Sequence, residues 1–171
     1  MIVEKYVKAL LAALNEDEIV EVYEAIARLA LVAKDPKFIL IVKSPVLTID
    51  EKVEILKELA ECDNPKFINF IRILLENKRI DLLKDIYQAL YAAVSKHFNT
   101  YAGVVIGKIS EETLKAIEEK LAKKFNATIK LRLKEEDIHG IKVFVDVLNI
   151  EVSVLEDKIK QDLLNFVLKA I

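Results

Sequence analysis

Apolar residues recur at helical spacing through about the first hundred positions, and this periodicity most constrains how the chain can fold. The interruptions are short and carry residues that begin or end helices, such as Asn64-Pro65 and Ser44-Pro45. Asp17 is the expected N-cap of the second helix, and Thr48 with Glu51 has the form of a capping box at the fourth. We therefore predict six helices, over residues 2–14, 17–33, 36–42, 48–60, 65–77 and 81–98.

From about residue 99 the pattern changes to one of strands and turns, with β-branched runs and strict alternation of apolar and basic residues. The predicted elements are a strand over 101–109, a helix over 111–125 capped by Ser110, a strand over 128–134, a turn over 137–140, a strand over 141–148 with a hairpin continuation to Val152, and a last helix over 155–171. Ser153 to Glu156 has the form of a capping box for that last helix.

The predicted fold class is therefore mainly α. We expect an N-terminal six-helix bundle over residues 1–99, followed by a small α+β (βαββα) C-terminal module over residues 100–171.

The composition is strongly apolar, at 53% of residues and a mean hydropathy of +0.26, so a membrane span has to be considered. The longest uninterrupted apolar runs are six residues, at 9–14 and 89–94, whereas a span requires roughly 20. The N-terminus passes directly into an amphipathic pattern without the features of a signal peptide. The sequence thus predicts a cytoplasmic protein whose excess apolar surface is buried in a core or against a partner.

The charge pattern argues against a general polyanion binder, because 26 basic and 28 acidic residues give a net charge of −2 without a charged tail. One strand face carries Lys130, Arg132 and Lys134, which could contact phosphates. Acidic residues follow it immediately at 135–137, and this favours a solvated face over nucleic-acid binding.

The sequence contains no recognisable catalytic or cofactor-binding constellation. His97 and His139 are far apart and have no partners at metal-ligand spacing, and the single Cys62 has the expected character of an ordinary free thiol. The three glycines do not have the spacing of a phosphate-binding loop. We therefore expect no catalytic residue, cofactor or metal, and a protein that binds rather than one that turns over a substrate.

Several segments, taken in order, resemble the delta subunit of F-type ATP synthases, the family of the mitochondrial oligomycin-sensitivity-conferring protein. The first helix carries Lys-Tyr-Val-Lys-Ala-Leu at 5–10, and the fifth carries the Asn-Phe-Ile to Asn-Lys-Arg-Ile stretch at 69–80. The turn at 137–140 and the Ile-Glu-Val-Ser-Val stretch at 150–154 resemble the family's final turn and last helix, although His139 and Glu151 replace a glycine and an aspartate of the family pattern.

The resemblance implies a non-catalytic stator subunit, present in one copy per complex. Such a subunit links the catalytic head to the b subunits of the peripheral stalk, so that rotation is coupled to proton transport and ATP synthesis. It would lie at the cytoplasmic face of the bacterial inner membrane and reach the membrane only through the complex.

The resemblance also implies two interaction sites. In the family, an N-terminal segment of an alpha subunit binds between the first and fifth helices, and the C-terminal module meets the b subunits. The matching alpha-subunit groove residues are Tyr6, Ala9, Ala13, Phe70, Ile73 and Asn77, of which Phe70 fits the bundle core equally well. On the last helix, the expected b-subunit contacts are Leu155, Ile159, Leu163 and Phe166, where core and docking roles cannot be separated.

Two other classes of function compete with this interpretation. A nucleic-acid-binding or protein-binding adaptor could use the C-terminal module, although the net charge disfavours nucleic acid. A small enzyme is the weakest alternative, because no catalytic constellation is present.

Overall fold

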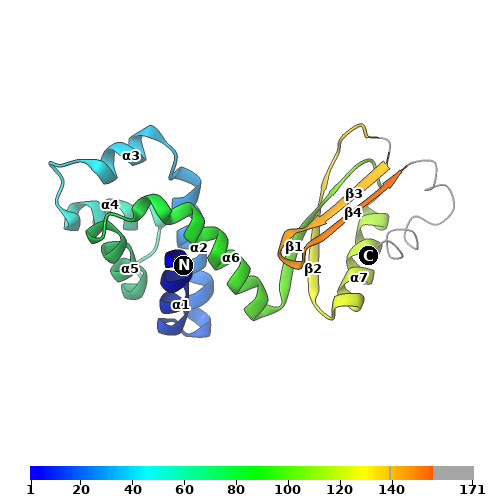
Figure 1. Cartoon of the computed structure of the whole chain (residues 1–171), viewed down its shortest axis with the longest axis horizontal. Helices are drawn as coiled ribbons and strands as arrows, with labels where there is room; N and C mark the ends of the chain where they lie inside the picture. Colours follow the sequence, from blue (N-terminus) through cyan, green and yellow to red (C-terminus); the bar gives the residue numbers. More distant parts are fainter. Residues whose placement is uncertain (139, 156–171) are drawn as a thin grey trace. The chain divides into compact units, whose positions relative to one another are not determined.

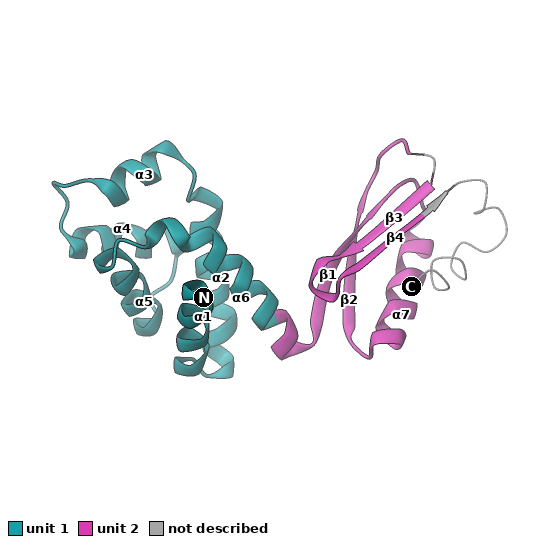
Figure 2. Ribbon diagram, viewed as in Figure 1, with its two compact units in different colours: residues 1–94 teal, residues 95–171 magenta. Residues whose placement is uncertain are grey.

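The computed structural model describes residues 1–138 and 140–155. The chain divides into two compact units, residues 1–94 and 95–171, with the boundary inside one helix (Figure 2). The elements in chain order are α1 (Ile2–Ala13), α2 (Glu16–Val32), α3 (Pro36–Lys43), α4 (Ile49–Ala60), α5 (Pro65–Glu76), the 3-10 turn η1 (Ile80–Leu82), α6 (Leu83–Phe98), β1 (Thr100–Ile106), α7 (Glu111–Phe125), β2 (Thr128–Lys134), β3 (Gly140–Val145), the 3-10 turn η2 (Asp146–Leu148) and β4 (Ile150–Leu155). The predicted mainly α class is confirmed.

The N-terminal unit is a helical bundle around one apolar core (Figure 1). α4 packs against both α2 and α5, and α1 packs against α5. The largest fully buried side chains of this core come from α2, α4, α5 and α6. They include Ile26, Leu29, Leu56, Phe67, Ile71, Leu74, Leu83, Ile86 and Leu90. Burial of this apolar surface is the main stabilising contribution to the bundle.

Side-chain caps fix where several of these helices begin. The predicted capping box at α4 is confirmed, because the Glu51 amide donates to Thr48 Oγ1 and the Thr48 amide donates to Glu51 Oε2. The prediction that Asp17 caps α2 is wrong. Asn15 is the N-cap instead, since its Oδ1 accepts from the Glu18 amide at 3.0 Å while Glu18 Oε2 accepts from the Asn15 amide at 3.0 Å.

The end of α5 also differs from the prediction. Asn77, a residue type that often adopts the left-handed conformation at helix ends, has φ −82° here, and Lys78 adopts that conformation instead, with φ +55°. The Lys78 amide donates to the Leu75 carbonyl and the Arg79 amide donates to the Leu74 carbonyl, a Schellman pair that ends α5 at Glu76, one residue earlier than predicted.

The C-terminal unit contains a four-stranded sheet with strand order β2-β1-β3-β4, covered on one face by α7 (Figure 1). β1 is parallel to β2 and antiparallel to β3, and β3 is antiparallel to β4. Alternate strand residues pack against Ile117 and Leu121 of α7: Tyr101, Val105, Ile129, Leu131, Ile141, Val143, Val145, Ile150 and Val152. α7 and β2 have the bounds that their sequence patterns predict.

Two predictions at the end of the sheet are wrong. The strand expected over 141–148 stops at Val145, because η2 and a left-handed Asn149 (φ +52°) form the turn into β4. Ser153 is not a helix cap but a strand residue opposite Lys142, since pairing of β3 with β4 continues to Leu155. Residues 156–171, where the rest of the predicted last helix falls, lie outside the described part of the chain.

The helices of the described residues are too short or too polar to cross a membrane.

Candidate functional site

The groove predicted between the first and fifth helices is organised around Tyr6. The Tyr6 ring on α1 meets the Phe70 ring of α5 edge to face, with centroids 6.2 Å apart and planes at 81°. Arg79 Nη1 lies 3.3 Å from Tyr6 Oη and donates to it, and the guanidinium carbon lies 5.9 Å from the ring centroid. The Tyr6–Phe70 ring contact thus connects α1 to α5, and Arg79 connects α1 to the segment that follows α5.

Beside this junction lies a cavity of about 500 Å³. It is lined by Met1, Ile2, Lys5, Tyr6, Ala9 and Arg79. The small Ala9 side chain allows another backbone to approach α1, Tyr6 supplies aromatic surface, and Lys5 and Arg79 add positive charge at the rim. This combination suits an apolar side chain together with a carboxylate.

The structure brings only part of the predicted groove into this cavity. Of the predicted residues, Tyr6 and Ala9 line the cavity, while Phe70 contacts Tyr6 from the bundle core, where Phe70 is 6% exposed. Ala13 and Ile73 are exposed on the same two helices. Asn77 is exposed as well, and its Nδ2 donates to the Ile73 carbonyl at 2.9 Å.

Arg79 is the residue that sequence reasoning missed at this site. In the sequence, Lys78 and Arg79 are explained sufficiently as cations after a helix, where the helix dipole favours positive charge. Its signal was the position of an arginine two residues beyond Asn77, immediately after the last turn of α5. Spacing alone did not show that the chain reverses there and carries this guanidinium back to α1.

The other candidate residues have ordinary structural roles. Cys62 is 3% exposed, and burial raises the pKa of its thiol, with the carboxylate of Glu21 acting in the same direction. The His97 ring packs edge to face on Phe98, and His139 lies outside the described residues. Among residues 1–138 and 140–155, no His, Cys, Asp and Glu side chains group as metal ligands.

The basic strand face of β2 is exposed, as predicted from its alternation. Lys130 and Arg132 point to the sheet face opposite α7, and Lys134 pairs there with Glu136. In the strand register, half-buried Val104 of β1 lies opposite Arg132, and half-buried Phe144 of β3 lies opposite Val104. This face therefore combines basic and apolar side chains.

The predicted b-subunit contacts fall at or beyond the described part of the chain. Leu155 is the last residue of β4 rather than part of a helix. Ile159, Leu163 and Phe166 lie outside the described residues.

Comparison with known proteins identifies the family. The family model described as ATP synthase delta (OSCP) subunit matches residues 2–163. The chain belongs to this family. The delta subunit of Campylobacter concisus is 38% identical to the chain over 173 residues, and that of Aliarcobacter butzleri is 31% identical, each alignment covering 100% of the chain and 98% of the relative.

A solved structure shows the same fold. A chain in the mitochondrial ATP synthase hexamer of Toxoplasma gondii superimposes with a TM-score of 0.66 at 20% identity, covering 100% of this chain and 99% of that one. Membership of the delta (OSCP) family makes the protein a non-catalytic stator subunit of the peripheral stalk of an ATP synthase. The family resemblance stated from the sequence is thereby confirmed.

Proposed function

We propose that the N-terminal unit of this delta subunit binds an N-terminal segment of an alpha subunit in the groove between α1 and α5. The C-terminal unit binds the ends of the b subunits. One copy links the catalytic head to the stalk at the cytoplasmic face of the bacterial inner membrane, and this link couples rotation to proton transport and ATP synthesis.

The arrangement around Tyr6 is the observation that carries the proposal for the N-terminal unit. The cavity brings together the aromatic surface of Tyr6, the small Ala9 and Lys5, all on α1, with Arg79 from the segment that follows α5. Helix-in-groove recognition uses this combination, because apolar anchors supply most of the affinity and small residues let the two backbones approach. Ile73 is an exposed apolar residue on α5, the other helix of the proposed groove.

The mechanical task favours a slowly dissociating complex. The head experiences torque during rotation, so the link has to persist through many turns, and complex lifetime is set mainly by the dissociation rate. A groove formed by packed helices is already ordered before binding, which lowers the entropic cost of association.

The groove is tested with a synthetic peptide of the alpha-subunit N-terminus from the same organism, titrated into the full-length protein by calorimetry. Ile73→Arg places a charge on an exposed apolar position of α5 and should weaken binding at least about tenfold. Val20→Arg is the matched control, because Val20 is also apolar and exposed but lies on α2. Unchanged affinity of the Ile73 variant, with circular dichroism as in the unmodified protein, would remove Ile73 from the site.

Truncation after Phe98 tests whether the two units bind different partners, and it retains α6 complete. The N-terminal unit has its own core, so it should still bind the alpha peptide while losing retention of b subunits on a pull-down. A truncated protein that retained b subunits would contradict the assignment of stalk binding to the C-terminal unit.

A further inference from the structure

β2 forms one outer edge of the sheet in the C-terminal unit. The strand order is β2-β1-β3-β4, and among the described residues β1 is the only strand that pairs with β2. An edge strand presents a row of backbone N–H and C=O groups to which another strand can add. Such an edge favours association between chains unless the fold closes it.

The backbone groups of β2 alternate between the side of β1 and the open side. The Thr128 amide donates to the Asn99 carbonyl, just before β1, at 3.0 Å. At the other end of the strand, the Lys134 carbonyl accepts from the Gly107 amide at 3.2 Å. The even-numbered residues therefore face β1, because the N–H and C=O of a strand residue point to one side and the side alternates along the strand. The odd-numbered residues face outward and are Ile129, Leu131 and Leu133.

The middle one of these outward amides is already occupied by a side chain of α7. The Leu131 amide donates to Glu118 Oε1 at 2.6 Å, and Glu118 is half-buried. A carboxylate forms a stronger hydrogen bond than the carbonyl of an incoming strand, because it is charged. Any strand that added along the whole of this edge would have to displace Glu118.

The exposed side chains of β2 oppose one partner in particular, a second copy of this chain. In an antiparallel pair of two β2 strands, outward-facing residues lie opposite outward-facing ones, so even-numbered residues also lie opposite even-numbered ones. On β2 the even-numbered residues after Thr128 are Lys130, Arg132 and Lys134. Like charges directly opposite each other across a strand pair are destabilising. Charge and the Glu118 contact therefore act in the same direction.

We propose that Glu118 makes an autoinhibitory contact that closes the outer edge of β2, and that the strand it excludes is β2 of a second copy of this chain. When the contact is removed, two copies join their sheets edge to edge. The contact thereby keeps the free subunit monomeric. The benefit to assembly rests on the proposed function, in which one copy links the head to the stalk.

The test compares the oligomeric state of full-length variants by analytical ultracentrifugation over a range of protein concentrations. Glu118→Ala frees one amide in each copy, so the dissociation constant of the dimer should fall at least about tenfold. Glu118→Gln retains a side-chain oxygen that can accept from the Leu131 amide and should stay monomeric. Glu119→Ala is the matched control, because it removes the same charge from the next, exposed position of α7, and it should also stay monomeric.

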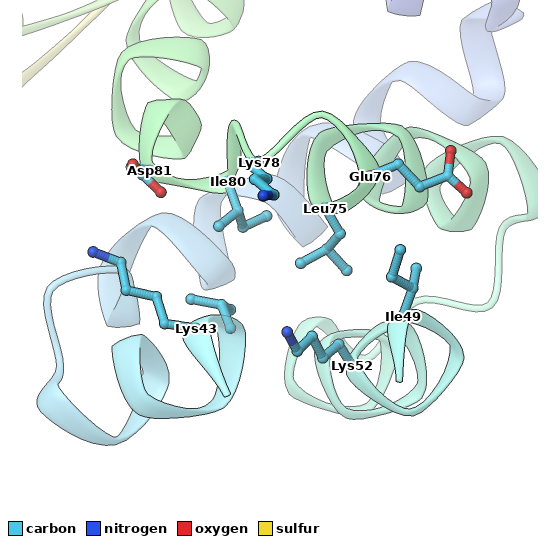
Figure 3. Close-up of a pocket in the computed structure, with 9 residues that line it drawn as sticks. Lys43, Ile49, Lys52, Leu75, Glu76, Lys78, Ile80 and Asp81 are labelled. Carbon is cyan, nitrogen blue, oxygen red and sulfur yellow. The ribbon is translucent and has the colours of Figure 1, made fainter. Parts of the chain in front are cut away.

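The row of cations is tested in the Glu118→Ala background. Lys130→Gln, Arg132→Gln should tighten the dimer about threefold further at low salt, and the gain should disappear at high salt, where the repulsion is screened. The control is Lys43→Gln, Lys52→Gln in the N-terminal unit. Both lysines line a cavity of about 430 Å³ between α3, α4 and the segment from α5 to η1 (Figure 3), away from any strand edge. This control changes the net charge equally and should leave the dimer unchanged.

Hydrogen exchange identifies the surface through which the copies join. At low protein concentration, Glu118→Ala should speed exchange of the Leu131 amide, because its acceptor is lost. At high concentration, the outward-facing amides of β2 should gain protection. The amides of Lys130 and Arg132, which face β1, should stay as they are.

A further variant keeps the proposal testable if Glu118→Ala loses the sheet. Glu118→Asp keeps the charge but is shorter by one methylene group, which withdraws the carboxylate from the Leu131 amide, so it should also dimerise. Monomeric Glu118→Ala and Glu118→Asp proteins with an intact sheet would overturn the proposal. Equal dimerisation of Glu119→Ala, or new protection outside β2, would overturn it as well.

Failure of this proposal is distinguishable from failure of the proposed function. The edge variants lie in the C-terminal unit, and each should bind the alpha-subunit peptide as the unmodified protein does. Loss of the alpha-subunit groove would therefore appear in the peptide titration with Ile73→Arg, whereas an error about Glu118 would appear in the oligomeric state alone.

Discussion

The two units differ in how they use glycine. The N-terminal unit contains none, whereas all three glycines of the chain lie in the C-terminal unit. In the bundle, Glu61 and Lys78 adopt the left-handed conformation at helix ends despite the steric cost. In the sheet, a Cβ at Gly103 would lie 2.5 Å from the Phe144 carbonyl oxygen. A helical core with deep burial tolerates strained turns, but a close strand contact does not tolerate a side chain.

The strongest test of this contrast compares two leucines of α2. Leu29 is 0% exposed and Leu31 is 85% exposed, although they are two residues apart. Leu29→Ala should lower the free energy of unfolding by about 2–5 kcal/mol, because it leaves a cavity in the core. Leu31→Ala should change it by less than about 0.5 kcal/mol. Urea unfolding followed by circular dichroism measures both, and similar losses for the two variants would contradict the burial that the structure assigns.

In the C-terminal unit, Gly103→Ala should have the next largest effect. The added methyl group would meet the Phe144 carbonyl and the side chains of Val145 and Leu131 at 2.5–2.8 Å, so strands have to shift. We expect a loss of about 1–3 kcal/mol, confined to this unit. Hydrogen exchange should show faster exchange in β1 and β3 and unchanged protection in α2 and α5. Ala102→Ser, at an exposed position of the same strand, is the control and should be neutral.

In the bundle, replacing a left-handed residue by glycine should instead stabilise the protein. Glu61→Gly replaces a left-handed residue (φ +51°) at the end of α4, where its amide donates to the Glu58 carbonyl. Relief of the steric cost should raise the free energy of unfolding by about 1 kcal/mol. Glu61→Ala keeps the Cβ and removes the charge, so it separates the backbone effect from the electrostatic one. A glycine variant no more stable than the alanine variant would show that the bundle does not carry this strain.

Sequence reasoning succeeded where one local signal decides the structure. The Thr48 capping box and the alternation of residues 128–134 each act within a few positions, and their elements have the expected bounds. The same reasoning failed at the start of α2. Asn15 and Asp17 are both good N-cap residues, and only the paired hydrogen bonds between Asn15 and Glu18 identify Asn15 as the cap.

The remaining errors depend on contacts between distant segments. Ser153 resembles a cap in isolation, but the pairing of β3 with β4 keeps it in a strand. Arg79 resembles a helix-end cation, but the turn at Lys78 places it beside Tyr6, 73 positions earlier in the chain. Periodicity cannot predict such contacts, because they require the folded path of the chain.

The smallest predicted effect concerns how pH acts on the bundle. The hydrogen bond and ion pair from Lys66 Nζ, 2.6 Å from Glu18 Oε2, hold the pKa of the Glu18 carboxyl below its usual range, with the Asn15 amide adding to the effect. A lowered folded-state pKa contributes stability that is fully present above the ordinary value of about 4.3 and is lost as the pH falls through the lowered one. Glu18→Gln should therefore be less stable than the unmodified protein at pH 7, and the difference should narrow on acidification. Lys66→Met removes the principal cause of the lowered Glu18 pKa, so its stability difference from the unmodified protein should also narrow on acidification. If the free energies of unfolding of the variants and the unmodified protein stay a constant distance apart between pH 7 and pH 3, this contact is not a source of acid sensitivity.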